Sequence, residues 1–405
     1  MKEIKFIHAA DLHLDSPMTG LSQLPKEIFT VLKDSTFEAL RKITDTAIEH
    51  QVDFVILAGD LFDEQDRSVR AQTRLRKEME RLEAHRISVY IIHGNHDHLN
   101  GSWIHLDMPA NVHIFGEHVE VKEFTKPNTT VYLYGFSYEK RHINENRLPE
   151  YVKKDMADFH IGILHGHFEG SSEHQPYAPF RLKELIDKRF DYWALGHIHK
   201  RSILHENPYI LYPGNIQGRN KKETGEKGCY LVTMNQADTK LEFIETAVIQ
   251  WEHLKVDGQE VKQFQDLYVL CQRAMEEKRK LGKGVLLSIT LRNIRLDDKE
   301  LTSVFNGDLL QALQEEEGEE DSFVWPIKIE VEQSISWNRS KLEKESDFYL
   351  ELFRAADNLE NIQDSISPLY NHPTAAKFLL SLSDKEKLEL QQQALNTLLD
   401  LIHKK

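Results

Sequence analysis

The chain has 405 residues, of which 40% are hydrophobic, and its formal net charge at pH 7 is -15. This length predicts more than one hydrophobic core, and the negative charge argues against a protein that coats nucleic acid nonspecifically, which needs a basic surface. No apolar run of about eighteen residues is present and the N-terminus does not resemble a signal peptide, so we expect a cytoplasmic protein without membrane contact.

The first elements along the chain predict two β-α-β units. Residues 4–9 and 52–58 are short apolar runs rich in β-branched residues, and a helix-compatible stretch lies between them. A helix over residues 68–83 and a strand over residues 88–92 repeat the pattern. Polar residues come directly after each strand, where a functional site is expected.

The next part of the chain is richer in strands. Strands are predicted at residues 131–136, 160–164, 191–195, 209–212 and 228–233. Helical patterns become scarce after about residue 190, which favours two packed sheets with flanking helices. We therefore predict an α/β catalytic domain over residues 1–255. Cys229 and Cys271 are the only cysteines, and they are expected to be buried and reduced.

The composition changes near residue 255. A helix at 260–280 and strands at 285–291 and 326–332 predict a small α/β cap domain over residues 256–338. Six of the seven residues from Glu315 to Asp321 are acidic, which is typical of a solvated loop.

The last part of the chain, residues 339–405, has a helical pattern throughout. Ser383 and Glu386 are predicted to form a capping box. The helix that follows carries an apolar stripe made of Leu388, Leu395, Leu398 and Ile402.

Five polar motifs follow predicted strands. They are Asp11-Leu-His13, Gly59-Asp60-Leu-Phe-Asp63, Gly94-Asn95-His96-Asp97, His165-Gly-His167 and Gly196-His197-Ile-His199. Loops at the carboxyl ends of strands converge at one cleft, so residues far apart in sequence can meet there. Mixed imidazole and carboxylate ligands suit manganese, iron or zinc, and the motifs offer no thiolate for a structural zinc site.

The spacing of these residues fits a dinuclear centre. Two cations roughly 3.5 to 4 Å apart can activate a water and neutralise charge on both oxygens of a phosphodiester displacement. One carboxylate must then bridge the cations, and Asp60 is the natural candidate. Alternate residues of an extended chain point the same way, so His197 and His199 can both reach one centre.

The motifs and their order closely resemble the calcineurin-like metallophosphoesterases, and more narrowly the nuclease subunit of SbcCD-type DNA repair complexes. The resemblance covers about residues 4–235 and implies a four-layered αββα domain. It implies two sets of metal ligands, namely Asp11, His13, Asp60 and His199 for one metal and Asp60, Asn95, His165 and His197 for the other. It also implies that His96 is a catalytic residue that assists the leaving group without binding metal. Gly214-Asn215 departs from the usual Gly-Ser of the nuclease subgroup.

The resemblance also implies a cofactor and partners. Two divalent metal ions, most often Mn²⁺ in such enzymes, would serve a nuclease acting on DNA. An SMC-like ATPase would dock on residues 339–405, and a homodimer is compatible with the same family. Two rival functions stay open: a small-molecule phosphodiesterase, and a partner-binding subunit whose activity is vestigial. The intact His96 argues against the second rival.

Some residues have two interpretations. His165 is favoured over His167 as the ligand because it follows its strand directly. Asp63 is expected to order its loop in preference to binding metal, and Asp97 to orient neighbouring groups in preference to attacking the substrate. His8 and His93 are expected to pack in the core. The residues Arg67, Arg70, Arg74, Arg76, Lys77 and Arg81 form either a salt-bridged helix face, which is favoured, or a DNA track. The residues Lys200, Arg201, Arg219, Lys221 and Lys222 either contact substrate or form a charged loop.

Overall fold

A computed structural model describes the chain apart from some short segments. These are residues 1, 19, 20, 22, 64–66, 102, 103, 105, 170–176, 319–321, 333–338, 358–361, 371–381 and 404–405. The described chain divides into two compact units, Met1–Glu330 and Val331–Lys405. None of its described helices is long and apolar enough to cross a membrane. The predicted domain limits at residues 255 and 338 stay predictions.

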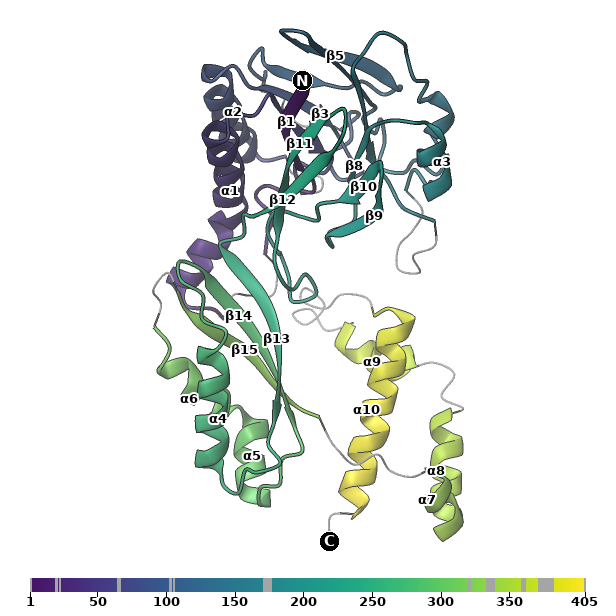
Figure 1. Cartoon of the computed structure of the whole chain (residues 1–405). Helices are drawn as coiled ribbons and strands as arrows, with labels where there is room; N and C mark the ends of the chain where they lie inside the picture. The colour runs from purple at the N-terminus through teal and green to yellow at the C-terminus, as the bar shows by residue number, and fades with distance from the viewer. Residues whose placement is uncertain are drawn as a thin grey trace. The chain divides into compact units, whose positions relative to one another are not determined.

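The first sheet of the larger unit has six strands in the order β12-β11-β1-β2-β3-β4. Figure 1 labels β1, β3, β11 and β12 of this sheet. They are β1 (Glu3–Ala9), β2 (Phe54–Ala58), β3 (Ser88–Ile92), β4 (Val112–Ile114), β11 (Gly228–Asn235) and β12 (Thr239–Glu245). The four strands from β1 to β4 run parallel. The helices α1 (Lys26–Glu49) and α2 (Val69–Ala84) pack on one face of this sheet, because their apolar stripes share a core with it.

The second sheet also has six strands, in the order β5-β6-β7-β8-β10-β9. They are β5 (Glu120–Lys126), β6 (Thr129–Gly135), β7 (Phe159–His165), β8 (Tyr192–Gly196), β9 (Ser202–Glu206) and β10 (Tyr209–Tyr212). The short helices η1 (Leu148–Glu150) and α3 (Leu182–Asp187) lie on its outer face, where Trp193, Phe190 and Leu185 form an apolar cluster.

The two sheets pack face to face through a second apolar core. Phe6 and Phe54 of the first sheet and Ile161 and Tyr192 of the second sheet are fully buried in it. The order of layers is therefore helices, sheet, sheet and helix, so the predicted four-layered αββα fold is confirmed. Because β1, β2 and β3 are parallel, as are β7 and β8, the loops at their carboxyl ends lie at the same edge of the sandwich.

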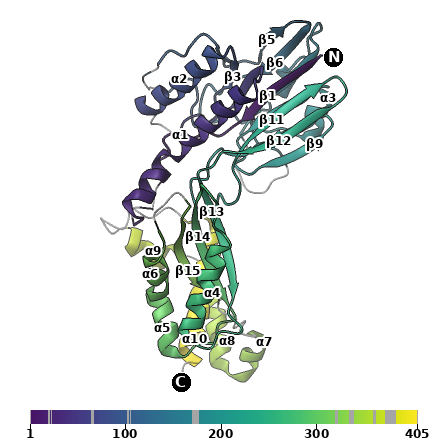
Figure 2. The same cartoon turned by 60° about the vertical axis from the view of Figure 1, so that its left-hand side comes forward.

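A smaller three-stranded sheet follows in the same unit, in the order β13-β14-β15. It consists of β13 (Ile249–Asp257), β14 (Gly284–Arg292) and β15 (Val324–Val331), with α4 (Phe264–Glu276), α5 (Asp298–Asn306) and α6 (Asp308–Glu315) beside it (Figure 2). Its Trp251, Leu286 and Trp325 share an apolar core with Ile28 and Leu32 of α1. The small sheet is thus anchored on the N-terminal half of α1.

The acidic segment after α6 is not solvated throughout. Glu317, whose side chain is only 7% exposed, forms an ion pair with Arg279 and accepts a hydrogen bond from the backbone N–H of Val324. This carboxylate thereby ties the end of α4 to the start of β15. Residues 319–321 of the segment lie outside the described part of the chain.

The second unit is helical, as predicted. Its helices are α7 (Arg339–Glu345), α8 (Asp347–Asp357), α9 (Ile362–Tyr370) and α10 (Asp384–His403). The capping box before α10 is confirmed, since the backbone N–H of Ser383 donates to Glu386 at 2.9 Å and that of Glu386 donates to Ser383 Oγ at 3.3 Å. On the apolar stripe of α10, Leu388 and Leu398 are exposed.

Candidate metal centre

The loops after β1 and β2 run side by side and begin the site. The backbone N–H of Asp11 donates to the carbonyl of Gly59, and that of His13 donates to the carbonyl of Asp60, both at 3.0 Å. Asp11, His13 and Asp60 have positive φ angles of 52°, 43° and 49°, and His197 has one of 104°. Non-glycine residues adopt such angles rarely and at a cost, and they concentrate at functional sites.

Gly94 allows the loop after β3 to approach the other loops. A Cβ atom at this position would collide with Oδ1 of Asp60 and would stand 2.7 Å from Nε2 of His165. The neighbouring Asp97 orders the same loop, because its carboxylate accepts hydrogen bonds from the backbone of Gly94 and Leu61 and contacts His93 Nδ1 at 2.8 Å. The ordering role predicted for Asp97 is confirmed.

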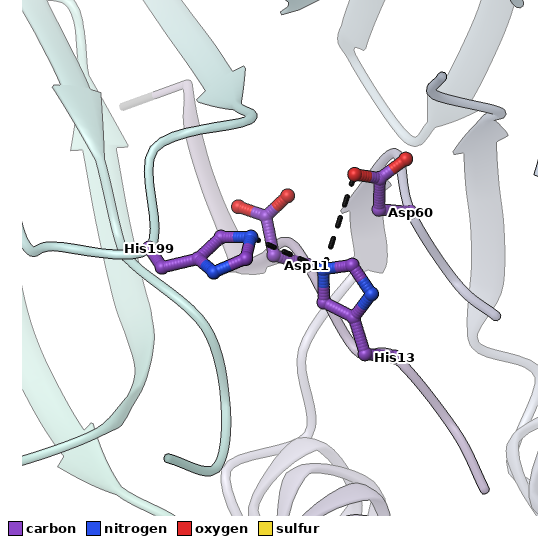
Figure 3. Close-up of side chains that lie close together, drawn as sticks. All are labelled: Asp11, His13, Asp60 and His199. Atoms are coloured by element: carbon purple, nitrogen blue, oxygen red, sulfur yellow. Dashed lines mark hydrogen bonds and ion pairs between the residues drawn. The ribbon is translucent and has the colours of Figure 1, made fainter. Parts of the chain in front are cut away.

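Asp11, His13, Asp60 and His199 form a first cluster of side chains that could hold a metal ion (Figure 3). The Nε2 atoms of His13 and His199 are 3.1 Å apart, and Nε2 of His13 lies 3.9 Å from Oδ2 of Asp60. The first three residues are buried and His199 is partly exposed. The cluster therefore opens to solvent on the side of His199.

Asp60, His165 and His197 form a second cluster, and Asn95 lies against it. Nε2 of His165 is 3.3 Å from Oδ2 of Asp60 and 3.0 Å from Oδ1 of Asn95. The same Asn95 oxygen is 3.2 Å from Nδ1 of His197. Asp60 belongs to both clusters, which is the arrangement that a bridging carboxylate requires.

Backbone hydrogen bonds orient the ligand candidates. Nδ1 of His165 lies 3.1 Å from the carbonyl of Ala58, which holds the ring with Nε2 directed toward Asp60. The carboxylate of Asp11 accepts the backbone N–H of His197 at 3.0 and 3.1 Å. His167, the alternative to His165, is buried with its ring 6.3 Å from that of His197, and it belongs to neither cluster.

Burial and the facing imidazoles set the charge of the site. Burial alone would raise the pKa of Asp60, but His165, His96 and His13 hold that pKa well below its usual range. For His165, burial is outweighed by the charges of Asp60 and Asp11, which raise its pKa to about 9. Burial lowers the pKa of His13 to about 3. His13 is therefore neutral at pH 7, which is the form that binds metals.

The geometry of the first cluster fits a cation. Nδ1 of His199 lies 2.8 Å from Glu223, and Nδ1 of His13 lies 3.4 Å from Asp63. The carboxylate of Glu223 favours a proton on Nδ1 of His199, so Nε2 of His199 presents its lone pair toward Nε2 of His13 at 3.1 Å. The donor set of carboxylate, imidazole and amide groups suits divalent metals such as manganese.

His96 lies beside the clusters. Its backbone N–H donates to Oδ1 of Asp60 at 2.9 Å, and its ring packs edge-on against that of His13 with centroids 5.1 Å apart. Its Nδ1 is 3.6 Å from Oδ1 of Asp63. The side chain is 23% exposed, so it can reach a bound substrate.

Glu223 is a site residue that the sequence did not single out. It belongs to the loop of residues 213–227, here called the site loop, between β10 and β11. The site loop is also hydrogen-bonded to β13. Gln217 Nε2 donates to the carbonyl of Ile249 at 2.6 Å, the backbone N–H of Gly225 donates to the carbonyl of Trp251 at 3.0 Å, and Trp251 Nε1 donates to the carbonyl of Gly218 at 3.0 Å.

Most of the candidate DNA contacts on α2 are engaged within the protein. Arg76 pairs with Glu80, Arg81 pairs with Asp45 and Glu78, and Arg70 pairs with Asp15 and Asp34. These pairs support the salt-bridged helix face. His8 and His93 are buried, and Cys229 and Cys271 are buried and free, all as predicted.

The family model and the curated relatives that the sequence matches agree with the geometry. The model of the calcineurin-like phosphoesterase family matches residues 4–201. The chain is 42% identical over 400 residues to an uncharacterized metallophosphoesterase, YhaO, of Bacillus subtilis, covering 97% of each chain. It is 27% identical over 300 residues to the DNA double-strand break repair protein Mre11 of Methanocaldococcus jannaschii, covering 69% of this chain and 76% of that one. A solved structure of GAP50 of Plasmodium matches 61% of this chain and 85% of its own at 13% identity, with a TM-score of 0.37.

Proposed function

The chain belongs to the calcineurin-like metallophosphoesterase family, and on this premise we propose that it is a dinuclear, Mn²⁺-dependent DNA nuclease that acts in DNA repair or processing. The observation that carries the proposal is the pair of side-chain clusters that share Asp60. Asp11, His13, Asp60 and His199 would hold one metal ion, and Asp60, Asn95, His165 and His197 would hold the other. When bound, two such ions would activate a water and neutralise charge on the phosphate.

The protein's own residues would prepare the reaction. Asp60 is kept ionised and is fixed by the backbone N–H of His96 at 2.9 Å. The His96 ring, partly exposed and next to Asp63, would hold the proton that the leaving oxygen takes up. The carboxylate of Asp63, 3.6 Å from Nδ1 of His96, faces the ring from the loop after β2.

A macromolecular substrate is favoured over a small phosphodiester. The named repair protein of Methanocaldococcus jannaschii aligns over 69% of this chain, well beyond the residues of the family model. A small-molecule phosphodiesterase has no need of the three-stranded sheet or the helical unit. The exposed apolar residues Phe348, Leu388 and Leu398 support docking of an SMC-like ATPase on residues 339–405. A homodimer and a cytoplasmic location complete the proposal.

The test compares DNA degradation with hydrolysis of bis-p-nitrophenyl phosphate. Linear single- and double-stranded DNA is incubated with Mn²⁺ and with the wild type, His96→Ala or His118→Ala, after metal content has been measured. His118 is the matched control, because its side chain is 76% exposed and lies beside Glu117. We expect His96→Ala to lose about 10²- to 10⁴-fold in rate with both metals bound, and His118→Ala to lose nothing.

The outcomes separate the rival functions. Hydrolysis of the small ester alone, in the presence and absence of added ATPase, would favour the small-molecule phosphodiesterase. A wild type that binds two metals and hydrolyses neither substrate would favour the partner-binding subunit. Equal rates for wild type and His96→Ala would remove His96 from the mechanism.

A further inference from the structure

Two carboxylates stand behind the two imidazoles of the first cluster. Oε1 of Glu223 is 2.8 Å from Nδ1 of His199, and Oδ1 of Asp63 is 3.4 Å from Nδ1 of His13. Carboxylates in this position fix the tautomer and the orientation of a metal-binding imidazole. Both are largely enclosed, with side chains 11% and 15% exposed. Glu223 is therefore within hydrogen-bonding distance of its imidazole, whereas Asp63, on a different loop, faces Nδ1 of His13 across a longer electrostatic contact.

Arg219 joins these two carboxylates. Its Nη1 is 3.1 Å from Oδ1 of Asp63, and its Nη2 is 3.3 Å from Oε1 of Glu223. The Arg219 side chain is itself only 15% exposed. A guanidinium group has donors in a rigid fork and no acceptor, so it can hold two acidic groups in a fixed relative position. We call Asp63, Arg219 and Glu223 the carboxylate clamp.

The site loop supports the Glu223 end of the carboxylate clamp. Oε2 of Glu223 accepts hydrogen bonds from Asn215 Nδ2 and from the backbone N–H of Arg219, each at 2.8 Å. At the other end, Oδ2 of Asp63 accepts a hydrogen bond from Ser16 Oγ at 2.7 Å. Both carboxylates thus use one oxygen for local support and the other for Arg219 and an imidazole.

Charge explains why an arginine is needed between them. Asp63 and Glu223 face the same guanidinium group, and like charges in a poorly solvated site repel. Without the guanidinium group, one carboxylate would turn away and release its imidazole. Both Nη atoms of Arg219 contact these carboxylates and its Nε is buried, so the guanidinium group is held between the two acidic residues.

We propose that Arg219 is a positioning residue which, through Asp63 and Glu223, orients His13 and His199 and so sets the affinity of the first metal without affecting the second. This rests on the proposed dinuclear centre. The second cluster has separate supports, namely the Ala58 carbonyl for His165 and Asn95 for His197. The clamp therefore acts on the imidazoles of the first site, while Asp60 stays common to both sites.

The experiment is a Mn²⁺ titration of the full chain, in which electron paramagnetic resonance measures free Mn²⁺. The proteins are the wild type, Arg219→Met, Arg219→Lys and Arg201→Met. Arg201 is the matched control, because it pairs with Glu226 at 3.2 Å outside the carboxylate clamp. We expect two bound ions in the wild type. In Arg219→Met one of them should bind about 10- to 100-fold more weakly, Arg219→Lys should restore part of this loss, and Arg201→Met should match the wild type.

A second variant tests whether the carboxylate clamp acts as a unit. Glu223→Gln should weaken the same ion, and combining it with Arg219→Met should add little, since residues of one network are not additive. The spin-coupled signal of a Mn²⁺ pair should vanish at one equivalent of metal in both variants. Thermal unfolding followed by circular dichroism shows whether each variant is folded.

Each result bears on one proposal or the other. If folded Arg219→Met binds both ions like the wild type and only KM rises, Arg219 contacts substrate and the clamp proposal is wrong. If both ions weaken equally, Arg219 supports the whole site and the selective role is wrong. If the wild type binds two ions and Arg219→Met loses one, the clamp stands even where no phosphodiester is cut, so failure of the proposed function is seen separately.

Discussion

Burial of His8 makes the stability of the larger unit depend on pH. His8 is fully buried, with Nδ1 3.0 Å from the Tyr192 hydroxyl and Nε2 3.1 Å from the Leu195 carbonyl. Burial lowers its pKa from 6.5 to about 3. As pH falls below 6.5, the unfolded chain takes up a proton that the folded chain refuses, so this contribution to stability is present above pH 6.5 and is lost toward pH 3.

The size of this effect can be measured. From pH 7 to pH 5 the wild type should lose about 2 kcal/mol in free energy of unfolding through His8. His8→Gln cannot take up a proton and should lose about 2 kcal/mol less over the same interval. Urea unfolding of both metal-free proteins at the two pH values is the measurement. Equal losses in the two proteins would show that His8 titrates normally in the fold.

Gly94 is a second residue on which the geometry of the site depends, because it has no side chain. In Gly94→Ala the methyl group would displace Asp60 or His165, so the second metal should bind at least about tenfold more weakly. Gly116→Ala is the control, because a Cβ there meets nothing within 4 Å. Metal content after dialysis against a weak chelator checks this. Full occupancy in Gly94→Ala would mean that the loop yields without disturbing the ligands.

At the scale of elements, β13 connects the small sheet to the rest of its unit. Trp251 is 3% exposed and packs against α1 residues, while its indole Nε1 donates to Gly218 in the site loop. Trp251→Ala should reduce the free energy of unfolding by about 3 to 5 kcal/mol. Trp251→Phe keeps most of the packing and should cost roughly 1 kcal/mol for the hydrogen bond. Urea unfolding measures the loss in free energy of unfolding for each variant. Similar losses in Trp251→Ala and Trp251→Phe would contradict a packing role.

The strands that carry ligands were predictable because they are buried on both faces. β2 is apolar throughout and ends at Ala58, directly before Gly59, and β8 ends at Gly196, so both the strand and its polar exit stand out in the sequence. β13 was missed, since Glu252, His253 and Lys255 interrupt its apolar pattern where it alternates between solvent and core. The hydrogen bonds of β13 to the site loop join residues that are far apart in the sequence. A local sequence pattern carries no information about such partners.

The candidate site divides in the same way. The side chains of the two clusters follow strands, and their clustering was expected from the shared sheet edge. Arg219 and Glu223 belong to a charged loop whose composition is that of ordinary surface, and only the fold brings them to Asp63 and His199. The positive φ angle of Asp60 was equally invisible, because aspartate adopts it only when neighbouring loops hold it there.

At the scale of the whole molecule, the two compact units predict that catalysis does not need the helical part. A chain ending at Glu330 keeps both clusters, the site loop and the small sheet. It should fold and hydrolyse bis-p-nitrophenyl phosphate with Mn²⁺ within about twofold of the full chain, because no ligand is lost. Circular dichroism and steady-state rates measure this. Loss of folding would show that residues 331–405 complete the core of the larger unit.

The hydrogen bonds between the site loop and β13 connect the small sheet to the candidate site. The site loop is attached at two places. Asn215 forms a β-bridge with Ala10 in the sandwich of the two large sheets, and Gln217 and Gly225 are hydrogen-bonded to β13. A bulky ligand that binds against the small sheet and displaces it would first move the site loop, which bears Glu223. A displacement of the small sheet should therefore move Glu223 and, through it, His199 of the first cluster. The exchange rate of the Gly225 amide would report such a displacement.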